Sequence, residues 1–580
     1  MNQHVFQNHM KNILGKLYPD KDTVQILGRA VRMIERYQDH AIILEKRKQY
    51  GDRISLNEND AILITYADTI RARGEKPLRT LHRFLKTYVK SAVTCVHILP
   101  FFPSSSDGGF SVVDYKTVDR EFGDWDDIQA IGRDYRLMAD LVMNHVSSQS
   151  AWFQGFLQGD ERYRDYFLSF DTPVDTSNVF RPRVHPLLTP FETAMGTKFV
   201  WTTFSEDQID LNFHNPNVLL EILDVFMRYL SRGIEFIRLD AVGYVWKEPE
   251  THCVNLPQTH EMVKLLRTVA EYAAPYAIIV TEVNFPYKYN LSYIEARHEA
   301  NMAYHFALPP LVIDSFLHKD ASILQQETAR IRQDLPFLNF LSSHDGIGLS
   351  SARDILPPSR FEALLETTEA HGGRISYKAT TDHGSMPYEL NITFYDAMND
   401  PLHPDIERDV SRFMAACSIM LVEKGVPGIY IHSLLGSRND VKAVEATGIN
   451  RMINRERLWA EELSGDLSDP ATLRSRVLAK FLHLLEVRKE IPAFHHAVKR
   501  EIPLSDKRLF VIERWHRNRC MTAVVNVSGD SIDLSQHQGK TDRIRNILFD
   551  GCVEPYGVYF LEEKAKDTGS NQANVLNADF

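Results

Sequence analysis

Acidic residues lie at or just after the ends of four short apolar runs in this 580-residue sequence: Asp140, Asp240, Glu282 and Asp345. A carboxylate at the end of a buried strand loses solvation, so it is normally paired or functional. One such residue alone is equally consistent with a structural ion pair. A pair of carboxylates flanking a bond is, however, what retaining glycoside cleavage needs, because one attacks the anomeric carbon while the other protonates the leaving oxygen.

The strands that must carry these carboxylates are predicted from eight apolar runs. Each run is bounded by polar, Gly or Pro residues and is followed by helix-like sequence, a pattern typical of a parallel sheet buried on both faces. The runs are 61–64, 93–99, 137–143, 234–239, 277–280, 302–308, 337–341 and 428–431. Eight such units predict an α/β fold, a (β/α)8 TIM barrel, in which reactive groups project from the carboxyl ends of the strands. Asp240, Glu282 and Asp345 would then meet at one mouth.

The spacing of the runs predicts additions to the barrel. Residues 1–60 have helical periodicity and form an N-terminal helical extension, whereas 146–205, rich in aromatic residues, Pro and Arg, form a small irregular lobe inserted after strand three, over the active site. The barrel then occupies 61–145 and 206–490, with a second excursion at about 350–420. Short strand-like runs predict a C-terminal antiparallel β-domain over 491–563, and 564–580 form a polar tail.

Composition excludes several classes of function. There are 66 Lys and Arg against 77 Asp and Glu, a net charge of -11, so we expect no nucleic-acid partner. The five cysteines are far apart and show no CxxC spacing, which indicates neither a disulfide framework nor a zinc ribbon. No apolar run approaches the length of a membrane span, and the N-terminus is too polar for a signal peptide. We expect a cytoplasmic protein without metal or other cofactor.

The carboxylate-bearing blocks resemble a known family. Four blocks of this sequence are similar, in order, to the four signature blocks of the α-amylase superfamily. They are Asp140-xxx-Asn144-His145, Arg238-Leu-Asp240-Ala241, Thr281-Glu282 and His344-Asp345. The resemblance implies that Asp240 is the nucleophile, Glu282 the general acid/base and Asp345 a third carboxylate that binds sugar hydroxyls. It also implies three substrate-binding neighbours: His145, Arg238 and His344. Arg238 lies on the same strand face as Asp240, where its charge would keep Asp240 ionised.

A narrower resemblance is carried by residues 99–111, 238–249, 344–348, 436–440 and 451–455, which are similar to the sucrose phosphorylase subfamily. It implies that Asp107 and Arg455 form an ion pair that grips the glucosyl hydroxyls, and that Phe110 and Phe204 form the apolar wall of the pocket. Within this subfamily, three segments look most like the glucosylglycerate phosphorylase branch: the N-terminal leader of roughly 60 residues, residues 64–68 and residues 247–249.

This resemblance implies a retaining glycoside phosphorylase. A glucosyl unit, best assigned to 2-O-α-glucosylglycerate, would pass through a covalent β-glucosyl-enzyme to inorganic phosphate, giving α-glucose 1-phosphate and glycerate. Arg183 in the inserted lobe and Arg438 after strand eight are the candidate phosphate and acceptor ligands, because guanidinium groups bind phosphate bidentately. In the subfamily, the position matching Arg183 and the loop matching 434–440 contribute to phosphate binding. The alternative for both arginines is a solvated surface position.

Other functions stay open at this point. The first alternative is a sucrose phosphorylase or sucrose 6-phosphate phosphorylase, since motifs of the glucosyl pocket do not separate these acceptors. A hydrolytic α-glucosidase would release glucose without phosphate. A catalytically silent binding subunit is disfavoured because all three carboxylates are present. The expected partners are small molecules, a glucoside and phosphate, and the sequence is compatible with a homo-oligomer.

Overall fold

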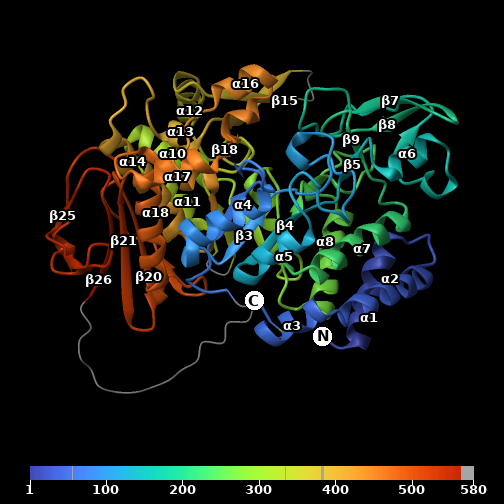
Figure 1. The fold of residues 1–580 in the computed structure, drawn as a ribbon, viewed down its shortest axis with the longest axis horizontal. Helices are drawn as coiled ribbons and strands as arrows, with labels where there is room; N and C mark the ends of the chain where they lie inside the picture. Colours follow the sequence, from blue (N-terminus) through green and yellow to red (C-terminus); the bar gives the residue numbers. More distant parts are fainter. Residues whose placement is uncertain (52, 55, 333–334, 381–383, 564–580) are drawn as a thin grey trace.

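Eight parallel strands close into a barrel in which the order around the ring follows the order along the chain (Figure 1). The computed structural model describes residues 1–51, 53–54, 56–332, 335–380 and 384–563. The barrel strands are β1 (Ile62–Thr65), β3 (Cys95–Ile98), β4 (Arg136–Val142), β10 (Ile234–Asp240), β11 (Ile278–Thr281), β12 (Met302–Tyr304), β13 (Phe337–Phe340) and β17 (Val426–Tyr430). Each overlaps one predicted run, so the predicted (β/α)8 barrel is confirmed.

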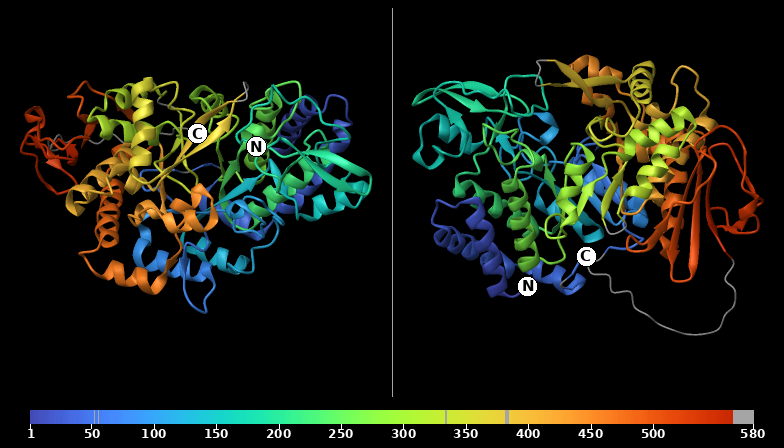
Figure 2. Two further views of the ribbon diagram at one scale, coloured as in Figure 1. Left: turned by 90° about the horizontal axis from the view of Figure 1, so that it is seen from above. Right: turned by 180° about the vertical axis from the view of Figure 1, so that it is seen from behind.

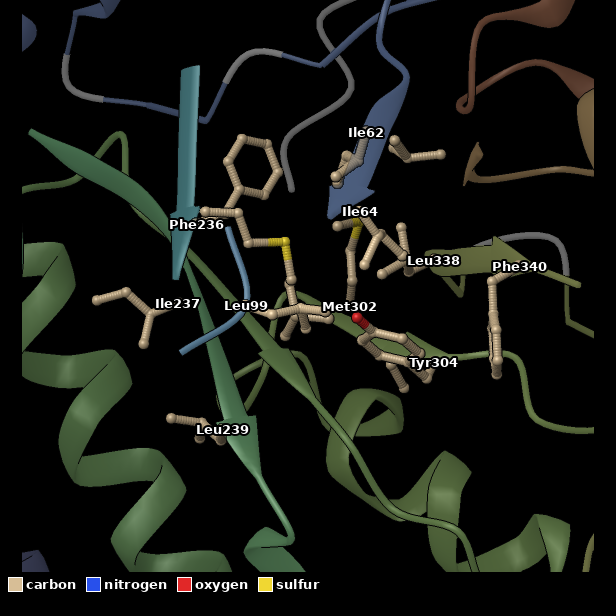
Figure 3. Packing of buried hydrophobic residues seen from close by; sticks show 14 of the residues in the cluster. Ile62, Ile64, Leu99, Phe236, Ile237, Leu239, Met302, Tyr304, Leu338 and Phe340 are labelled. Carbon is tan, nitrogen blue, oxygen red and sulfur yellow. The ribbon is translucent and has the colours of Figure 1, made fainter. Parts of the chain in front are cut away.

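The barrel strands are apolar because both of their faces are buried. In β10, Phe236 lies on one side of the strand, whereas Ile237 and Leu239 project to the other side (Figure 3). All seven residues of β10 are buried, including Arg238 and Asp240. This alternation places Arg238 and Asp240 on the inner face, at the carboxyl end of the strand.

Helices surround the barrel and connect its strands: α4 (Pro77–Phe84), α5 (Trp125–Asp134), α7 (Pro216–Ser231), α8 (Pro257–Ala273), α9 (Tyr287–Glu295), α10 (Leu308–His318), α11 (Ser322–Arg330), α14 (Ile406–Val422) and α18 (Leu473–Lys489). The sequence at 215–216 explains why α7 begins there. Asn215 caps the helix by accepting from the Asn217 amide, and Pro216 occupies the first turn, where no amide hydrogen is needed.

The N-terminal extension consists of α1 (Gln3–Leu17), α2 (Thr23–Gln38) and α3 (Ala41–Tyr50). Phe6 of α1 stacks on Tyr272 of α8 with ring centroids 4.0 Å apart, and the Tyr18 hydroxyl donates to the Phe213 carbonyl at 2.9 Å. Lys46 of α3 forms a 2.7 Å ion pair with Glu235, near the start of β10. The extension is therefore docked against α7 and α8, below the inserted lobe in the view of Figure 1.

Two insertions lie at the same end of the molecule (Figures 1 and 2). The lobe after β4 contains β5 (His145–Ser147), α6 (Ala151–Leu157), β6 (Ser169–Phe170), β7 (Leu188–Thr193), β8 (Gly196–Trp201) and β9 (Gln208–Asp210). The lobe is more regular than predicted, because β6, β8 and β7 form an antiparallel sheet. The second insertion contains β14 (Ile347–Gly348), α12 (Pro358–Ala370), β15 (Arg374–Ala379), β16 (Ser385–Asn391) and α13 (Phe394–Met398).

The C-terminal region forms the predicted antiparallel sheet. Its strands are β19 (Lys499–Glu501), β20 (Leu509–His516), β21 (Arg519–Asn526), β23 (Thr541–Asp542), β24 (Ile547–Leu548) and β26 (Val558–Glu562). The buried Arg514 of β20 donates to the carbonyls of Val422 and Glu423 and so ties this sheet to the end of α14. The predicted polar tail, 564–580, lies outside the described residues. No helix in the described part of the chain is long and apolar enough to span a bilayer.

Candidate active site

Strand register brings Asp240 and Glu282 to the same level. In the β10–β11 pair, Arg238 is opposite Val280 and Leu239 is opposite Thr281, so the next position joins Asp240 and Glu282. The Glu282 amide continues the pairing by donating to the Leu239 carbonyl at 3.2 Å. Ala241 then adopts a left-handed conformation with φ of 46°, and its amide donates to the Glu282 carboxylate at 2.9 Å. Strained backbone of this kind is concentrated at functional sites.

Arg238 links the carboxylates at the barrel mouth. One of its terminal nitrogens lies 2.6 Å from Asp140 and 2.7 Å from Asp240, and the other lies 3.8 Å from Glu282. On the opposite side, Asp140 is 2.8 Å from His97. Burial disfavours a charge on Asp140, but His97 and Arg238 outweigh it and lower the pKa of that carboxyl. Arg238 therefore lies between Asp140 and Asp240, on the strand face that the sequence predicted.

Burial raises the pKa of Asp240 well above its usual value, although Arg238 opposes the rise. Burial also raises the pKa of Glu282, and the charge of Asp345 adds to this effect. The charge of Glu282 adds to the rise at Asp240, so ionisation of one of these carboxyls opposes ionisation of the other. Because Arg238 is 2.7 Å from Asp240 and 3.8 Å from Glu282, the negative charge is favoured on Asp240 and the proton on Glu282.

Asp345 is held by a residue to which the sequence assigned no role. Arg451, in the 3-10 turn Asn450–Asn454, forms a 2.6 Å ion pair with Asp345 and a second one with Glu389 of β16 at 2.7 Å. Burial opposes ionisation of Asp345, but Arg451 and His344 together outweigh the effect of burial and lower the pKa of this carboxyl. Asn454 donates to the Ser343 and Asp345 carbonyls and fixes the loop. Asp345 is therefore an anion at neutral pH, unlike Glu282, whose pKa is raised.

The expected ion pair between Asp107 and Arg455 is not formed by these two described residues. Arg455 instead donates to the His344 carbonyl at 2.8 Å, and its guanidinium packs against Gly108. Asp107 accepts from Gln208 at 3.2 Å and still lines the pocket. The guanidinium of Arg455 is instead directed toward Asp345, 3.9 Å away, which Arg451 contacts at 2.6 Å.

Aromatic and imidazole rings form the pocket wall. Phe110 stacks on His344 with centroids 4.8 Å apart, while Phe204 packs 5.2 Å from Tyr244 and 5.3 Å from His145. Burial lowers the pKa values of His145 and His344, so both rings are neutral at pH 7. The Tyr244 hydroxyl and the His344 Nδ1 atom are buried without a hydrogen-bond partner. Such atoms suit a ligand with many hydroxyls, because each would gain the partner that it lacks.

The two predicted phosphate ligands have different environments. Arg183 lines the catalytic pocket, with its guanidinium carbon 5.9 Å from the Phe204 ring and 6.0 Å from the Tyr388 ring. Arg438 pairs with Asp396 and lies beside Tyr395, and it lines a separate cavity with Arg457 and Arg474. The structure therefore brings Arg183, but not Arg438, to the three carboxylates. Tyr388 and Glu389 also line the pocket, although they lie in an insertion and follow no barrel strand.

Lys247, in the segment after β10, forms a buried ion pair with Asp210 of β9 in the inserted lobe. The Lys247 ammonium lies 2.6 Å from the Asn144 side-chain oxygen and 2.7 Å from Asp210. Lys247 is 4% exposed and Asp210 is fully buried. Asn144 also donates to Asp210 at 3.1 Å. Within the described ranges, no cluster of three or more His, Cys, Asp or Glu side chains is arranged to hold a metal ion.

Replacing Lys247 with Met is expected to destabilise the protein by about 3–5 kcal/mol, because Asp210 would be left as a buried charge without its cation. Guanidinium unfolding of the variant measures this effect. The exposed Lys442→Met variant in α16 (Val441–Thr447) is the matched control and should unfold like the wild type. An unchanged midpoint for Lys247→Met would show that the ammonium makes no net contribution.

The sequence of this chain is similar to that of known proteins. Residues 85–345 match the family described as "Alpha amylase, catalytic domain". The chain is 47% identical to a glucosylglycerate phosphorylase from Spirochaeta thermophila over 80% of this chain and 79% of that protein. It is 31% identical to a sucrose phosphorylase from Agrobacterium vitis over 86% of this chain and 98% of that protein.

A solved structure supports the same assignment. The sucrose 6F-phosphate phosphorylase from Thermoanaerobacter thermosaccharolyticum superposes with a TM-score of 0.72 at 26% identity, and the match covers 82% of this chain and 95% of that one. The barrel and the order of its carboxylate-bearing strands accord with these matches. The chain therefore belongs to the α-amylase family, in the group that contains the glucosylglycerate and sucrose phosphorylases.

Proposed function

We propose that this protein is a retaining glucoside phosphorylase that transfers a glucosyl unit from 2-O-α-glucosylglycerate to inorganic phosphate. The observation that carries the proposal is the pairing of Asp240 and Glu282 across β10 and β11, in a pocket that also contains the cation of Arg183. A carboxylate pair supplies the nucleophile and the acid of a double displacement. A cation beside it favours an anionic acceptor over water.

In the proposed cycle, Asp240 attacks C1 of the glucosyl unit while Glu282 protonates the departing glycerate oxygen. The C1–oxygen bond breaks, and a β-glucosyl ester of Asp240 forms. Phosphate then attacks C1, its proton passing to Glu282, and Asp240 leaves to give α-glucose 1-phosphate with net retention. Asp345, held as an anion by Arg451, binds sugar hydroxyls. His145, His344 and Phe110 complete the glucosyl pocket.

Glycerate is the proposed leaving group because the chain is more similar to a glucosylglycerate phosphorylase than to a sucrose phosphorylase. The deciding experiment incubates the protein and phosphate with glucosylglycerate, sucrose and sucrose 6-phosphate, and assays glucose 1-phosphate. Release from glucosylglycerate alone supports the proposal. Release from sucrose or its phosphate would assign a different acceptor, and glucose without glucose 1-phosphate would identify a hydrolase.

Replacing Arg183 with Ala is expected to raise the KM for phosphate by about 10- to 100-fold, since a charge-assisted contact to a buried anion contributes roughly 1.5–3 kcal/mol. The effect on glucosyl binding should be smaller, because the guanidinium of Arg183 lies against aromatic rings of the pocket wall, Phe204 and Tyr388. Steady-state kinetics with phosphate varied at saturating glucoside measures the effect. Arg438→Ala is the matched control outside this pocket. Equal KM values in both variants would reject the role of Arg183.

A further inference from the structure

Lys378 on β15 is a buried cation without a carboxylate partner in the described part of the chain. Lys378 is 9% exposed. Its ammonium nitrogen lies 4.6 Å from the centroid of the Phe180 ring and 5.3 Å from the centroid of the Tyr388 ring. Removing an ammonium group from water costs free energy, and cation–π contacts with aromatic rings offset only part of it. A buried lysine in this setting gains most from an anion that is supplied from outside the chain.

The electrostatic environment of Lys378 is positive. Burial and, to a smaller extent, the nearby charge of Arg353 lower its pKa to about 8. The Tyr388 phenol faces it from β16, and burial keeps that phenol protonated. Arg183 approaches the same Tyr388 ring from the lobe. Arg353, Tyr388 and Arg183 therefore provide no negative charge to pair with the Lys378 ammonium.

Lys378 contacts the wall of the catalytic pocket through Tyr388. Tyr388 lines that pocket together with Arg183. Phe180, the other ring beside Lys378, packs 5.0 Å from Phe285, and Phe285 is itself a pocket residue. A cation from each insertion, Arg183 from the lobe and Lys378 from the β15–β16 hairpin, thus lies near the ring of Tyr388.

We propose that Lys378 belongs to the acceptor subsite and binds the carboxylate of the small organic acid that leaves from, or attacks, the glucosyl-enzyme. This inference rests on the proposed function. In a 2-O-glucosylated acid, one carbon separates the glycosidic oxygen from the carboxyl group, so the carboxylate lies one bond farther from C1 than the outer oxygens of phosphate do. The outer of two cations therefore fits the carboxylate, and the inner one, Arg183, fits phosphate.

The test measures acceptor preference in the synthetic direction, with α-glucose 1-phosphate as donor. The quantity is kcat/KM for glycerate divided by kcat/KM for glycerol, its uncharged counterpart. Lys378→Met keeps the length of the side chain but removes the charge, and it should lower this ratio at least tenfold. Lys378→Arg should restore part of the ratio. The exposed Lys11→Met on α1 is the matched control and should leave the ratio unchanged.

A pH profile separates charge recognition from packing. Glycerate is an anion throughout the range of the assay, so in the wild type the ratio should fall as pH rises past about 8, where Lys378 loses its proton. The ratio should be flat in Lys378→Met, and in Lys378→Arg it should not fall at this pH, because guanidinium stays protonated. A ratio that is the same in Lys378→Met and the wild type would overturn the proposal. So would a loss confined to the KM for phosphate.

Failure of the proposed function has a separate signature. If the wild type releases no glucose 1-phosphate from glucosylglycerate, the assignment of the reaction is wrong. Calorimetric binding of glycerate and of glycerol to the wild type and Lys378→Met then decides the role of the lysine by itself. Weaker binding of glycerate alone in the variant supports the anion site, and equal binding contradicts it.

Discussion

Replacing Asp240 with Asn is expected to reduce glucosyl transfer by about four to six orders of magnitude, the range seen when a nucleophile is removed from a covalent mechanism. The amide has no charge with which to form the glucosyl ester. Its size and shape are those of the carboxylate, so the amide oxygen can still accept from Arg238 at the position that Asp240 occupies, 2.7 Å away. The measurement is the rate of glucose 1-phosphate formation from glucosylglycerate, with a circular dichroism spectrum to show that the fold is retained.

The exposed Asp20→Asn variant is the matched control for Asp240→Asn, because Asp20 lies between α1 and α2, away from the barrel mouth. It should turn over at the wild-type rate. The two variants make the same chemical change, so a difference between them is due to position. Turnover of Asp240→Asn near the wild-type rate would remove Asp240 from the mechanism and leave Glu282 without a nucleophilic partner.

The strands and the three carboxylates were predictable because they depend on local pattern and on the geometry of parallel sheets. A strand buried on both faces must be apolar throughout, so a charged residue at its end is conspicuous. Arg238 and Asp240 were predictable for the same reason: residues two apart on a strand share a face. Once eight strands close in chain order, the register of β10 and β11 brings Asp240 and Glu282 together.

The partners of these residues were not predictable in this way, because they come from loops and insertions. Arg451 and Arg455 lie four positions apart, and the path of the loop places Arg451 2.6 Å from Asp345 and Arg455 3.9 Å from it. Arg438 could not be separated from Arg183 by residue type, yet Asp396 of α13 holds it away from the pocket. Lys378 and Tyr388 belong to a hairpin whose sequence follows no barrel strand. Because arginine and lysine side chains are long, a small difference in the path of the backbone changes which group the end of the side chain contacts.

Replacing Glu282 with Gln is expected to slow phosphorolysis of glucosylglycerate by about 10²- to 10⁴-fold, the contribution typical of a general acid. The glycerate oxygen is a poor leaving group unless it receives a proton as the C1–oxygen bond breaks. Glu282 is suited to supply that proton, because burial raises its pKa and the nearby Asp240 takes the negative charge. In the wild type, phosphorolysis should therefore fall as pH rises through the raised pKa of Glu282, and in Glu282→Gln this fall should disappear.

The leaving group distinguishes the roles of the two carboxyls. Fluoride departs without a proton, so formation of the glucosyl-enzyme from α-glucosyl fluoride should be affected far less in Glu282→Gln than phosphorolysis of glucosylglycerate is. Asp240→Asn should lose both reactions, because each needs the nucleophile. Rapid-quench measurement of fluoride release gives the first step directly in both variants. If Glu282→Gln slows fluoride release as strongly as it slows phosphorolysis of glucosylglycerate, Glu282 acts on the sugar or on Asp240 and does not donate the proton. The assignment of acid and nucleophile, which Arg238 favours through its closer contact with Asp240, would then have to be reversed or abandoned.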